Sequence, residues 1–133
     1  MYEKIILVSG PVIVKDNKVL LDISSKDDFW KFCGGQVREH ETLQETAIRR
    51  ANEELGINTE IIDSSPFLLH LTKKKNNVPK DVILVHWLAK ADEEITPGKD
   101  VKEWQWMTLK DLKKHNIGPN IVPTLKHFGF IQE

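Results

Sequence analysis

The stretch that most restricts how this chain can fold joins two glycines to a capped amphipathic helix. Thr42 is a favourable N-cap, and Glu45 three residues later completes a capping box, in which each side chain accepts a hydrogen bond from the other residue's backbone N–H. Gly56 stands where a glycine closes a helix, because glycine takes the left-handed conformation without steric cost. The sequence therefore predicts a helix from Thr42 to Leu55.

This helix is predicted to have one apolar and one charged face. The apolar face has small side chains that let a helix lie close to a sheet, and consists of Leu43, Ala47, Ala51 and Leu55, with Ile48 beside them. The outward face carries Glu41, Glu45, Arg49, Arg50, Glu53 and Glu54. Carboxylates next to a glycine turn offer the hard oxygen ligands that magnesium or manganese prefers. The alternative is a solvated face in which each Glu–Arg pair contributes only about 0.2–0.5 kcal/mol.

The spacing of these glycines and charged residues resembles the Nudix box. That family pattern fixes nine positions across 23 residues, and this chain matches eight of them: Gly35, Glu41, Arg49, Ala51, Glu53, Glu54, Gly56 and Ile57. The ninth is Arg50, where the family has the first of three box glutamates that bind divalent metals or assist the attacking water. Milder departures are Cys33 in place of proline, Arg38 in place of an acid and His40 in place of glycine.

The resemblance covers nearly the whole chain and implies a single Nudix-like domain over residues 1–133. It implies an α+β fold, an α/β/α sandwich in which helices flank a mixed β-sheet. The implied activity is metal-dependent hydrolysis of a nucleoside diphosphate linked to another moiety, at a rate reduced by Arg50, with Mg²⁺ or Mn²⁺ as the cofactor. The alternative is a non-catalytic module of the same fold that binds a nucleotide or a phosphate.

The resemblance also assigns roles to individual residues. The groups implied to bind the metal are the Gly34 carbonyl and the carboxylates of Glu53 and Glu54, with Glu41 behind them. Arg49 would orient Glu53 through an i,i+4 pair. Asp100, with Glu103 as the second choice, would supply the acid that activates water in place of the missing glutamate.

Arg50 allows two interpretations. At about 4 Å and an effective dielectric of 20, two unit charges interact by roughly 4 kcal/mol, so a guanidinium beside the box carboxylates would weaken metal binding. Alternatively, its planar fork could turn toward the substrate and bind a phosphate through two hydrogen bonds. Arg38 and Trp30 are the other predicted substrate contacts. An aromatic ring such as that of Trp30 can stack on a base, although packing in the core is the alternative role.

Hydrophobic patterns outside the box predict further elements. The predicted strands cover residues 2–14, 19–24, 57–62, 67–72, 81–91 and 101–107, and the predicted helices cover residues 109–115 and 121–128. The first two strands are expected to form a hairpin around a polar turn at residues 15–18. Residues 73–80 predict a basic loop, which is either a solvated hairpin tip or an attractant for a polyanionic substrate.

Composition excludes several other classes of protein. A formal net charge of -1 gives no electrostatic case for nucleic acid, and no apolar segment approaches the length of a membrane span. The single cysteine, Cys33, cannot form an internal disulfide, which fits a reducing compartment and predicts a cytoplasmic protein. The expected partner is therefore a small nucleotide or nucleotide sugar, bound by a monomer or a homodimer.

Overall fold

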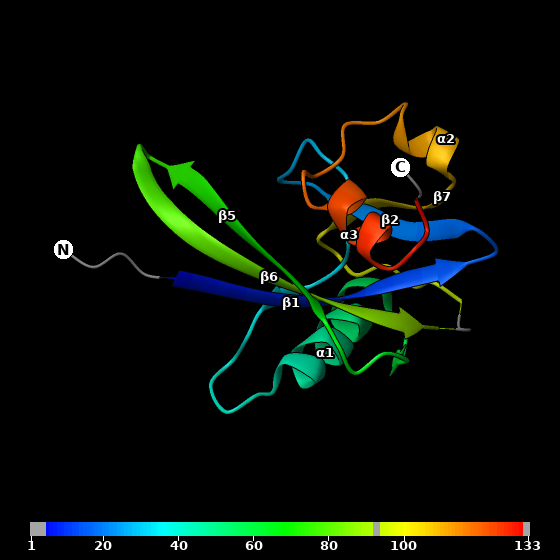
Figure 1. The fold of residues 1–133 in the computed structure, drawn as a ribbon, viewed down its shortest axis with the longest axis horizontal. Coiled ribbons are helices and arrows are strands. Elements are labelled where there is room, and N and C mark those ends of the chain that lie inside the picture. Colours follow the sequence, from blue (N-terminus) through cyan, green and yellow to red (C-terminus); the bar gives the residue numbers. More distant parts are fainter. Residues whose placement is uncertain (1–4, 92–93, 132–133) are drawn as a thin grey trace.

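The computed structural model, which describes residues 5–91 and 94–131, is a mixed β-sheet between helices (Figure 1). The strands are β1 (Ile5–Lys15), β2 (Lys18–Ser24), β3 (Gly35–Gln36), β4 (Glu60–Ile61), β5 (Phe67–Lys75), β6 (Val78–Lys90) and β7 (Val101–Met107). The helices are α1 (Leu43–Leu55), α2 (Leu109–Leu112) and α3 (Ile121–His127). Helix α1 lies on one side of the sheet, and α2 and α3 lie on the other (Figure 1). The predicted α/β/α arrangement is therefore confirmed.

Strand β1 is the centre of the sheet. It runs antiparallel to β2 through a tight turn at Asp16 and Asn17, whose φ angles of 52° and 62° are left-handed, a conformation that Asp and Asn tolerate well. It runs parallel to β6, from the pair of Ile5 and Asp81 onward. The remaining strands extend the sheet formed by β1, β2 and β6. Strand β3 pairs with β1, β7 pairs with β2, and both β4 and β5 pair with β6.

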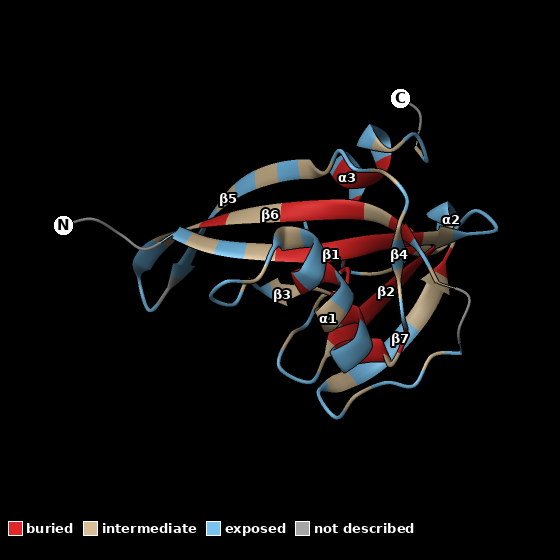
Figure 2. Cartoon of the chain, turned by 90° about the horizontal axis from the view of Figure 1, so that it is seen from below, coloured by how far each residue is buried: buried red, intermediate tan, exposed pale blue. Residues whose placement is uncertain are grey.

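Alternate residues of the central strands pack on opposite faces of the sheet, so hydrophobic clusters form on both faces. On the face covered by α2 and α3, Val12 and Leu21 pack in one cluster with Ile121. On the face covered by α1, Ile13 of β1 and Leu20 of β2 pack in a second cluster with Ala51 and Leu55 of the helix. Buried residues accordingly run along β1, β2 and β6 (Figure 2).

The predicted caps of α1 are present. Thr42 Oγ1 accepts a hydrogen bond from the Glu45 N–H at 3.1 Å, and Glu45 Oε1 accepts one from the Thr42 N–H at 2.8 Å. Gly56 has a left-handed φ of 66°. His40, which stands where the Nudix pattern has glycine, also has a φ of 66°, so the backbone at this position has the conformation that favours glycine.

The predicted faces of α1 need two corrections. The sequence pattern predicts Glu54 on the outward face, but this residue is only 8% exposed. Because Glu54 follows Ala47 by seven residues and Ala51 by three, helix geometry places it on the apolar stripe rather than opposite to it. The same pattern predicts Ile48 beside the apolar stripe, but this residue is 38% exposed. One box carboxylate is therefore buried, while its neighbour Glu53 faces outward.

The basic stretch at residues 73–80 forms a hairpin tip, which is one of its two predicted roles, but it is not a loop over that whole length. Strands β5 and β6 continue through it, and the turn consists only of Asn76 and Asn77, both with left-handed φ angles. Such angles at both central residues are typical of a two-residue hairpin turn, which lets the strands pair up to the turn. The tip of this hairpin projects away from α1 (Figure 1).

Other element boundaries differ from the prediction in smaller ways. The predicted strand at residues 57–62 is reduced to β4, because Ile57 is fully buried in the core cluster around α1 directly after the helix cap. The predicted helix at residues 109–115 is the short α2, which has the Thr108 and Asp111 capping box. Part of the first predicted strand, residues 2–4, lies outside the described residues.

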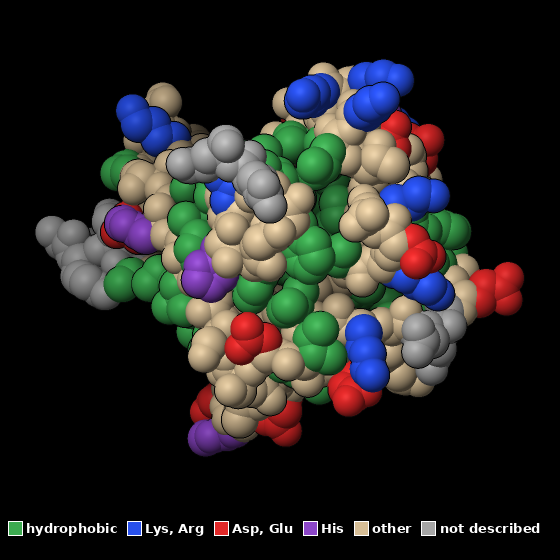
Figure 3. Space-filling model, turned by 45° about the vertical axis from the view of Figure 1, so that its right-hand side comes forward, with side chains coloured by type: hydrophobic (Ala, Val, Ile, Leu, Met, Phe, Trp, Pro, Cys, Tyr) green, Lys and Arg blue, Asp and Glu red, His purple; other side chains and the backbone are tan. Residues whose placement is uncertain are grey.

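The face of the molecule drawn in Figure 3 shows no dominant charge. Figure 3 shows hydrophobic side chains near the middle of one face, with basic and acidic side chains distributed around them, in keeping with the net charge of -1. Neither α1 nor any shorter helix in the described part of the chain is long and apolar enough to cross a bilayer.

Candidate active site

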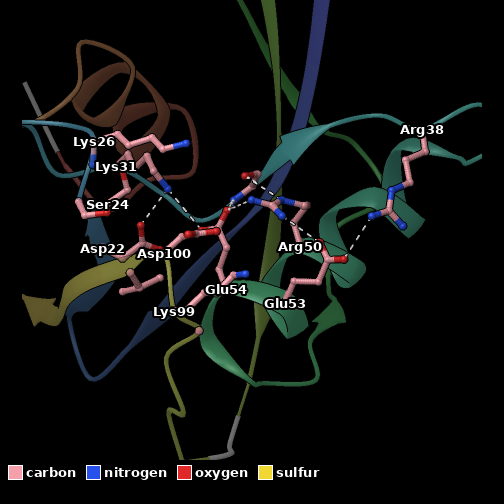
Figure 4. A pocket seen from close by; sticks show the side chains of 14 residues that line it. Asp22, Ser24, Lys26, Lys31, Arg38, Arg50, Glu53, Glu54, Lys99 and Asp100 are labelled. Atoms are coloured by element: carbon pink, nitrogen blue, oxygen red, sulfur yellow. Dashed lines mark hydrogen bonds and ion pairs between the residues drawn. The ribbon is translucent and has the colours of Figure 1, made fainter.

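A cavity of about 560 Å³ lies beside α1. It is bounded by β2, by the segment that leads into β3, by α1 and by the loop before β7 (Figure 4). Its basic lining residues are Lys26, Lys31, Arg38, Arg50 and Lys99, and its acidic lining residues are Asp22, Glu53, Glu54 and Asp100. Both box carboxylates that the sequence analysis assigned to metal binding therefore line the same cavity.

The guanidinium of Arg50 occupies the centre of the predicted metal site. Its Nε donates to the Gly34 carbonyl at 3.3 Å, its Nη1 to Glu53 Oε1 at 2.9 Å, and its Nη2 to Glu54 Oε1 at 2.6 Å. Partial burial alone would lower the pKa of Arg50, but the charges of Glu54 and Glu53 raise it above its usual value, so the group stays cationic. Three of the four groups predicted to hold the metal are thus hydrogen-bonded to Arg50, and the fourth, Glu41, pairs with Arg49 instead.

A second cation, Lys31, holds the other oxygen of Glu54. Its Nζ lies 3.3 Å from Glu54 Oε2 and 2.8 Å from Asp22 Oδ1. The Asp22 side chain is fully buried, and its Oδ2 has no hydrogen-bond partner among the described residues. Burial raises the pKa of Glu54, and Lys31 offsets part of that rise. The site is therefore a chain of alternating charges, which we call the ion-pair chain: Asp22, Lys31, Glu54, Arg50 and Glu53 (Figure 4).

Sequence reasoning missed Asp22 and Lys31. They face each other across a short antiparallel bridge, in which each backbone N–H donates to the other residue's carbonyl at 2.9 and 2.8 Å. A signal was present in both segments. Asp22 interrupts an otherwise apolar run, and Lys31 stands between Trp30 and Phe32, so that alternation turns it away from the face that those two rings share.

Arg49 forms the predicted i,i+4 ion pair with Glu53. Its Nη1 donates to Glu53 Oε1 at 2.9 Å, its Nε to Glu41 Oε2 at 2.7 Å, and its Nη2 to the Gln36 carbonyl at 3.1 Å. The hydrogen bonds from Arg49 lower the pKa of Glu41 to about 2. Glu41 therefore anchors Arg49 from behind, and Arg49 ties β3 and the following loop to the box helix.

The loop before β7 brings Asp100 to the cavity as predicted. The Gly98 N–H donates to the Glu54 carbonyl at 2.7 Å, and the Thr96 N–H donates to the Leu55 carbonyl at 2.8 Å, so this loop is fastened to the end of α1. Three of the four lining carboxylates pair with a lysine or an arginine, but in the described part of the chain Asp100 has no such ion pair.

Of three other predicted site residues, one lines the cavity and two do not. Arg38 lines the cavity and lies 3.4 Å from Glu53 Oε2, with a side chain that is 64% exposed. Glu103 is exposed on β7, paired in register with Ile23, and is not one of the residues that line the cavity. Trp30 is buried in the core, edge-on to His115 with ring centroids 5.4 Å apart, so its ring packs in the core and does not line the cavity.

In the observed arrangement, cationic side chains of the protein itself hold the oxygens that could bind a divalent cation. The donor chemistry is suitable, because carboxylate and carbonyl oxygens are hard ligands. However, the Gly34 carbonyl oxygen, one oxygen of Glu53 and both oxygens of Glu54 already accept hydrogen bonds from Arg50 or Lys31. Within the described residues, no three His, Cys, Asp or Glu side chains are grouped in a way that could hold a metal ion.

The combination of this sheet, the capped box helix and the adjoining cavity defines a Nudix-type domain. A profile described as the NUDIX domain matches residues 7–128, and the chain belongs to that family. This confirms the predicted family, and the α+β fold agrees with it.

Two curated relatives and one solved structure illustrate the similarity. The chain is 23% identical over 130 residues to the CTP pyrophosphohydrolase of Escherichia coli K12, covering 94% of this chain and 92% of that relative. It is 32% identical over 109 residues to the ADP-ribose pyrophosphatase of Methanocaldococcus jannaschii, covering 77% of this chain and 62% of that relative. The crystal structure of a MutT protein from Methanosarcina mazei Go1 superposes with a TM-score of 0.77 at 19% identity, over 96% of this chain and 95% of that one. The predicted enzyme class, a Nudix-type pyrophosphohydrolase, is the class that both curated relatives are named for.

Proposed function

We propose that this chain binds a nucleoside diphosphate linked to another moiety and hydrolyses its phosphoric anhydride bond slowly. The observation that carries this proposal is the cavity itself, in which two box carboxylates and five basic side chains face one space. Basic side chains favour a phosphate ligand. The relatives support the same substrate class, since their names refer to CTP and to ADP-ribose.

The surroundings of the cavity offer room for the group attached to the diphosphate. A second cavity of about 240 Å³ shares Lys31 and Gly34 with the first. Its lining is more apolar and includes Phe29, Phe32 and Leu84, together with the polar side chain of Asn120. Ligand sites typically combine an apolar lining with a few polar groups. We therefore propose that the diphosphate lies in the first cavity and that the attached moiety reaches into the second.

Magnesium or manganese remains our proposed cofactor for turnover. Because Arg50 holds the same oxygens, we expect weak metal binding and hence slow hydrolysis. Asp100 is the proposed acid for activation of water, since it is the lining carboxylate that no described lysine or arginine holds in an ion pair.

The test is an activity panel with Mg²⁺ or Mn²⁺ and a set of nucleoside triphosphates, dinucleotides and nucleotide sugars. We expect slow, metal-dependent turnover by the wild type, turnover about tenfold faster or more by Arg50→Glu, and none by Glu54→Gln. Lys74→Glu, which makes the same type of charge change on the β5 strand away from the cavity, is the matched control and should behave as the wild type.

The second candidate is a binding module that does not cleave its ligand. The specific observation in its favour is that Arg50 neutralises both box carboxylates. If the wild type and Arg50→Glu were both inert across the whole panel while a nucleotide bound tightly, this second candidate would replace the first.

A further inference from the structure

We infer that the cavity binds the diphosphate group of its ligand without a divalent metal, because Arg50 and Lys31 already supply the positive charge at the box carboxylates. This inference rests on the proposed function only in taking a diphosphate as the ligand. It departs from that proposal by separating binding, which would need no metal, from turnover.

The first argument is the charge of the cavity. Lys31 and Arg50 neutralise the buried carboxylates Asp22 and Glu54 through direct contacts of 2.6–3.3 Å. The lining then contains one more basic than acidic side chain, although the chain as a whole has a net charge of -1. An anionic ligand therefore meets a site whose buried negative charges are already compensated by fixed groups of the protein.

The second argument is that both internal cations keep N–H groups available. A guanidinium has five N–H donors, and Arg50 uses three of them on Gly34, Glu53 and Glu54. An ammonium has three, and Lys31 uses two of them on Asp22 and Glu54. Their side chains are 31% and 25% exposed, and both line the cavity, so the remaining donors can reach a phosphate oxygen there.

The third argument comes from the rim of the same cavity. Lys26 and Lys99 line it from two different loops, and neither forms an ion pair within the described residues (Figure 4). A diphosphate has two phosphoryl groups, and the two internal cations and two rim lysines provide charge for both. Charge-assisted hydrogen bonds of this kind are about twice as strong as neutral ones.

The test measures equilibrium binding by calorimetry, with a methylene-bridged ADP analogue that cannot be cleaved at the diphosphate and with inorganic pyrophosphate as a second probe. Each titration is run in EDTA and again in excess Mg²⁺. We expect the wild type to bind the analogue in EDTA with a Kd within about threefold of its value in Mg²⁺. Arg50→Gln should weaken binding in EDTA by about tenfold or more, because it removes the charge and most donors at the centre of the site.

Two further variants complete the design. Arg50→Lys keeps the charge but loses the planar fork, so it should fall between the wild type and Arg50→Gln. Lys74→Gln removes one positive charge outside the cavity and should bind as the wild type does. Thermal unfolding of each variant establishes that it is folded before it is titrated.

The outcomes separate this inference from the proposed hydrolysis. If EDTA abolished binding to the wild type while Mg²⁺ restored it, the inference would be overturned even if hydrolysis were observed. Unchanged binding by Arg50→Gln in EDTA would also overturn it. Conversely, tight binding in EDTA without turnover of any compound on the panel would support the inference and refute the hydrolase proposal.

Discussion

The Lys31→Met substitution tests whether the ion-pair chain is a structural requirement of the domain. Methionine retains an unbranched apolar side chain of similar length, but it removes the ammonium that lies 2.8 Å from Asp22 Oδ1 and 3.3 Å from Glu54 Oε2. Glu54 would keep its contact with Arg50. Among the described residues, Asp22 would have no cation left, and its fully buried side chain already has one oxygen without a hydrogen-bond partner.

The expected loss of stability follows from the burial of Asp22. Removal of one partner from a buried ion pair costs about 3–5 kcal/mol, because an uncompensated charge stays in the interior. We expect the lower part of this range, about 3 kcal/mol in the free energy of unfolding, because Lys31 is itself 25% exposed. For a domain of this size, that loss corresponds to a fall in Tm of roughly 10 °C.

Urea unfolding followed by tryptophan fluorescence measures the effect. The matched control is Lys90→Met, which breaks the ion pair of Lys90 with Glu60, where the two side chains are 56% and 70% exposed and the atoms are 3.5 Å apart. An exposed pair of this kind contributes at most about 1 kcal/mol. The double variant Asp22→Asn with Lys31→Met should recover most of the loss, since no charge is left unpaired. A loss no larger than that of Lys90→Met would refute the reasoning.

Two further predictions concern other parts of the domain. His86 is buried, its Nδ1 lies 3.0 Å from the Phe67 carbonyl and must donate to it, and its Nε2 therefore accepts from Asn120 Nδ2 at 3.0 Å. Burial lowers the pKa of His86 below the usual value of about 6.5 that the unfolded chain would have. The free energy of unfolding should therefore fall as the pH drops below about 6.5. In denaturant titrations at several pH values, Asn120→Asp should weaken or reverse this trend. Gly10→Ala should lower the free energy of unfolding by about 3 kcal/mol, because an added Cβ would overlap the backbone carbonyl of Cys33, which cannot rotate away; a loss below about 1 kcal/mol in urea would contradict this.

Local chemistry explains why the box helix was predictable in detail. The hydrogen bonds of the Thr42 and Glu45 capping box and the left-handed Gly56 depend on residues within one turn of each helix end, so they can be recognised from the sequence alone. The order of strands in the sheet and the parallel pairing of β1 with β6 join residues more than 70 positions apart. Periodicity predicts that strands exist, but it does not indicate which strands are neighbours.

The two missed residues show the same limit within the site. Asp22 and Lys31 form their contact across two segments, and the contact of Lys31 with Glu54 depends on the packing of α1 against the sheet. Neither contact joins residues at a sequence spacing from which the contact could be predicted. By contrast, Trp30 and Glu103 were predicted from residue type and family position, and tertiary packing buries the first and leaves the second on β7 outside the cavity lining.

The sequence left open whether Arg50 contacts the box carboxylates or turns toward the substrate, and helix geometry explains why it contacts the carboxylates. Residues three and four positions apart lie on the same side of a helix, so an arginine at position 50 stands beside both Glu53 and Glu54 whatever the rest of the domain does. A cation tethered in this way has a high effective concentration at the carboxylates, which a free metal ion must overcome. Arg50→Glu would therefore make two changes at once, because it removes the tethered cation and also adds a third carboxylate. Arg50→Gln makes only the first change, so a comparison of metal binding in these two variants separates the competition by the guanidinium from the missing ligand.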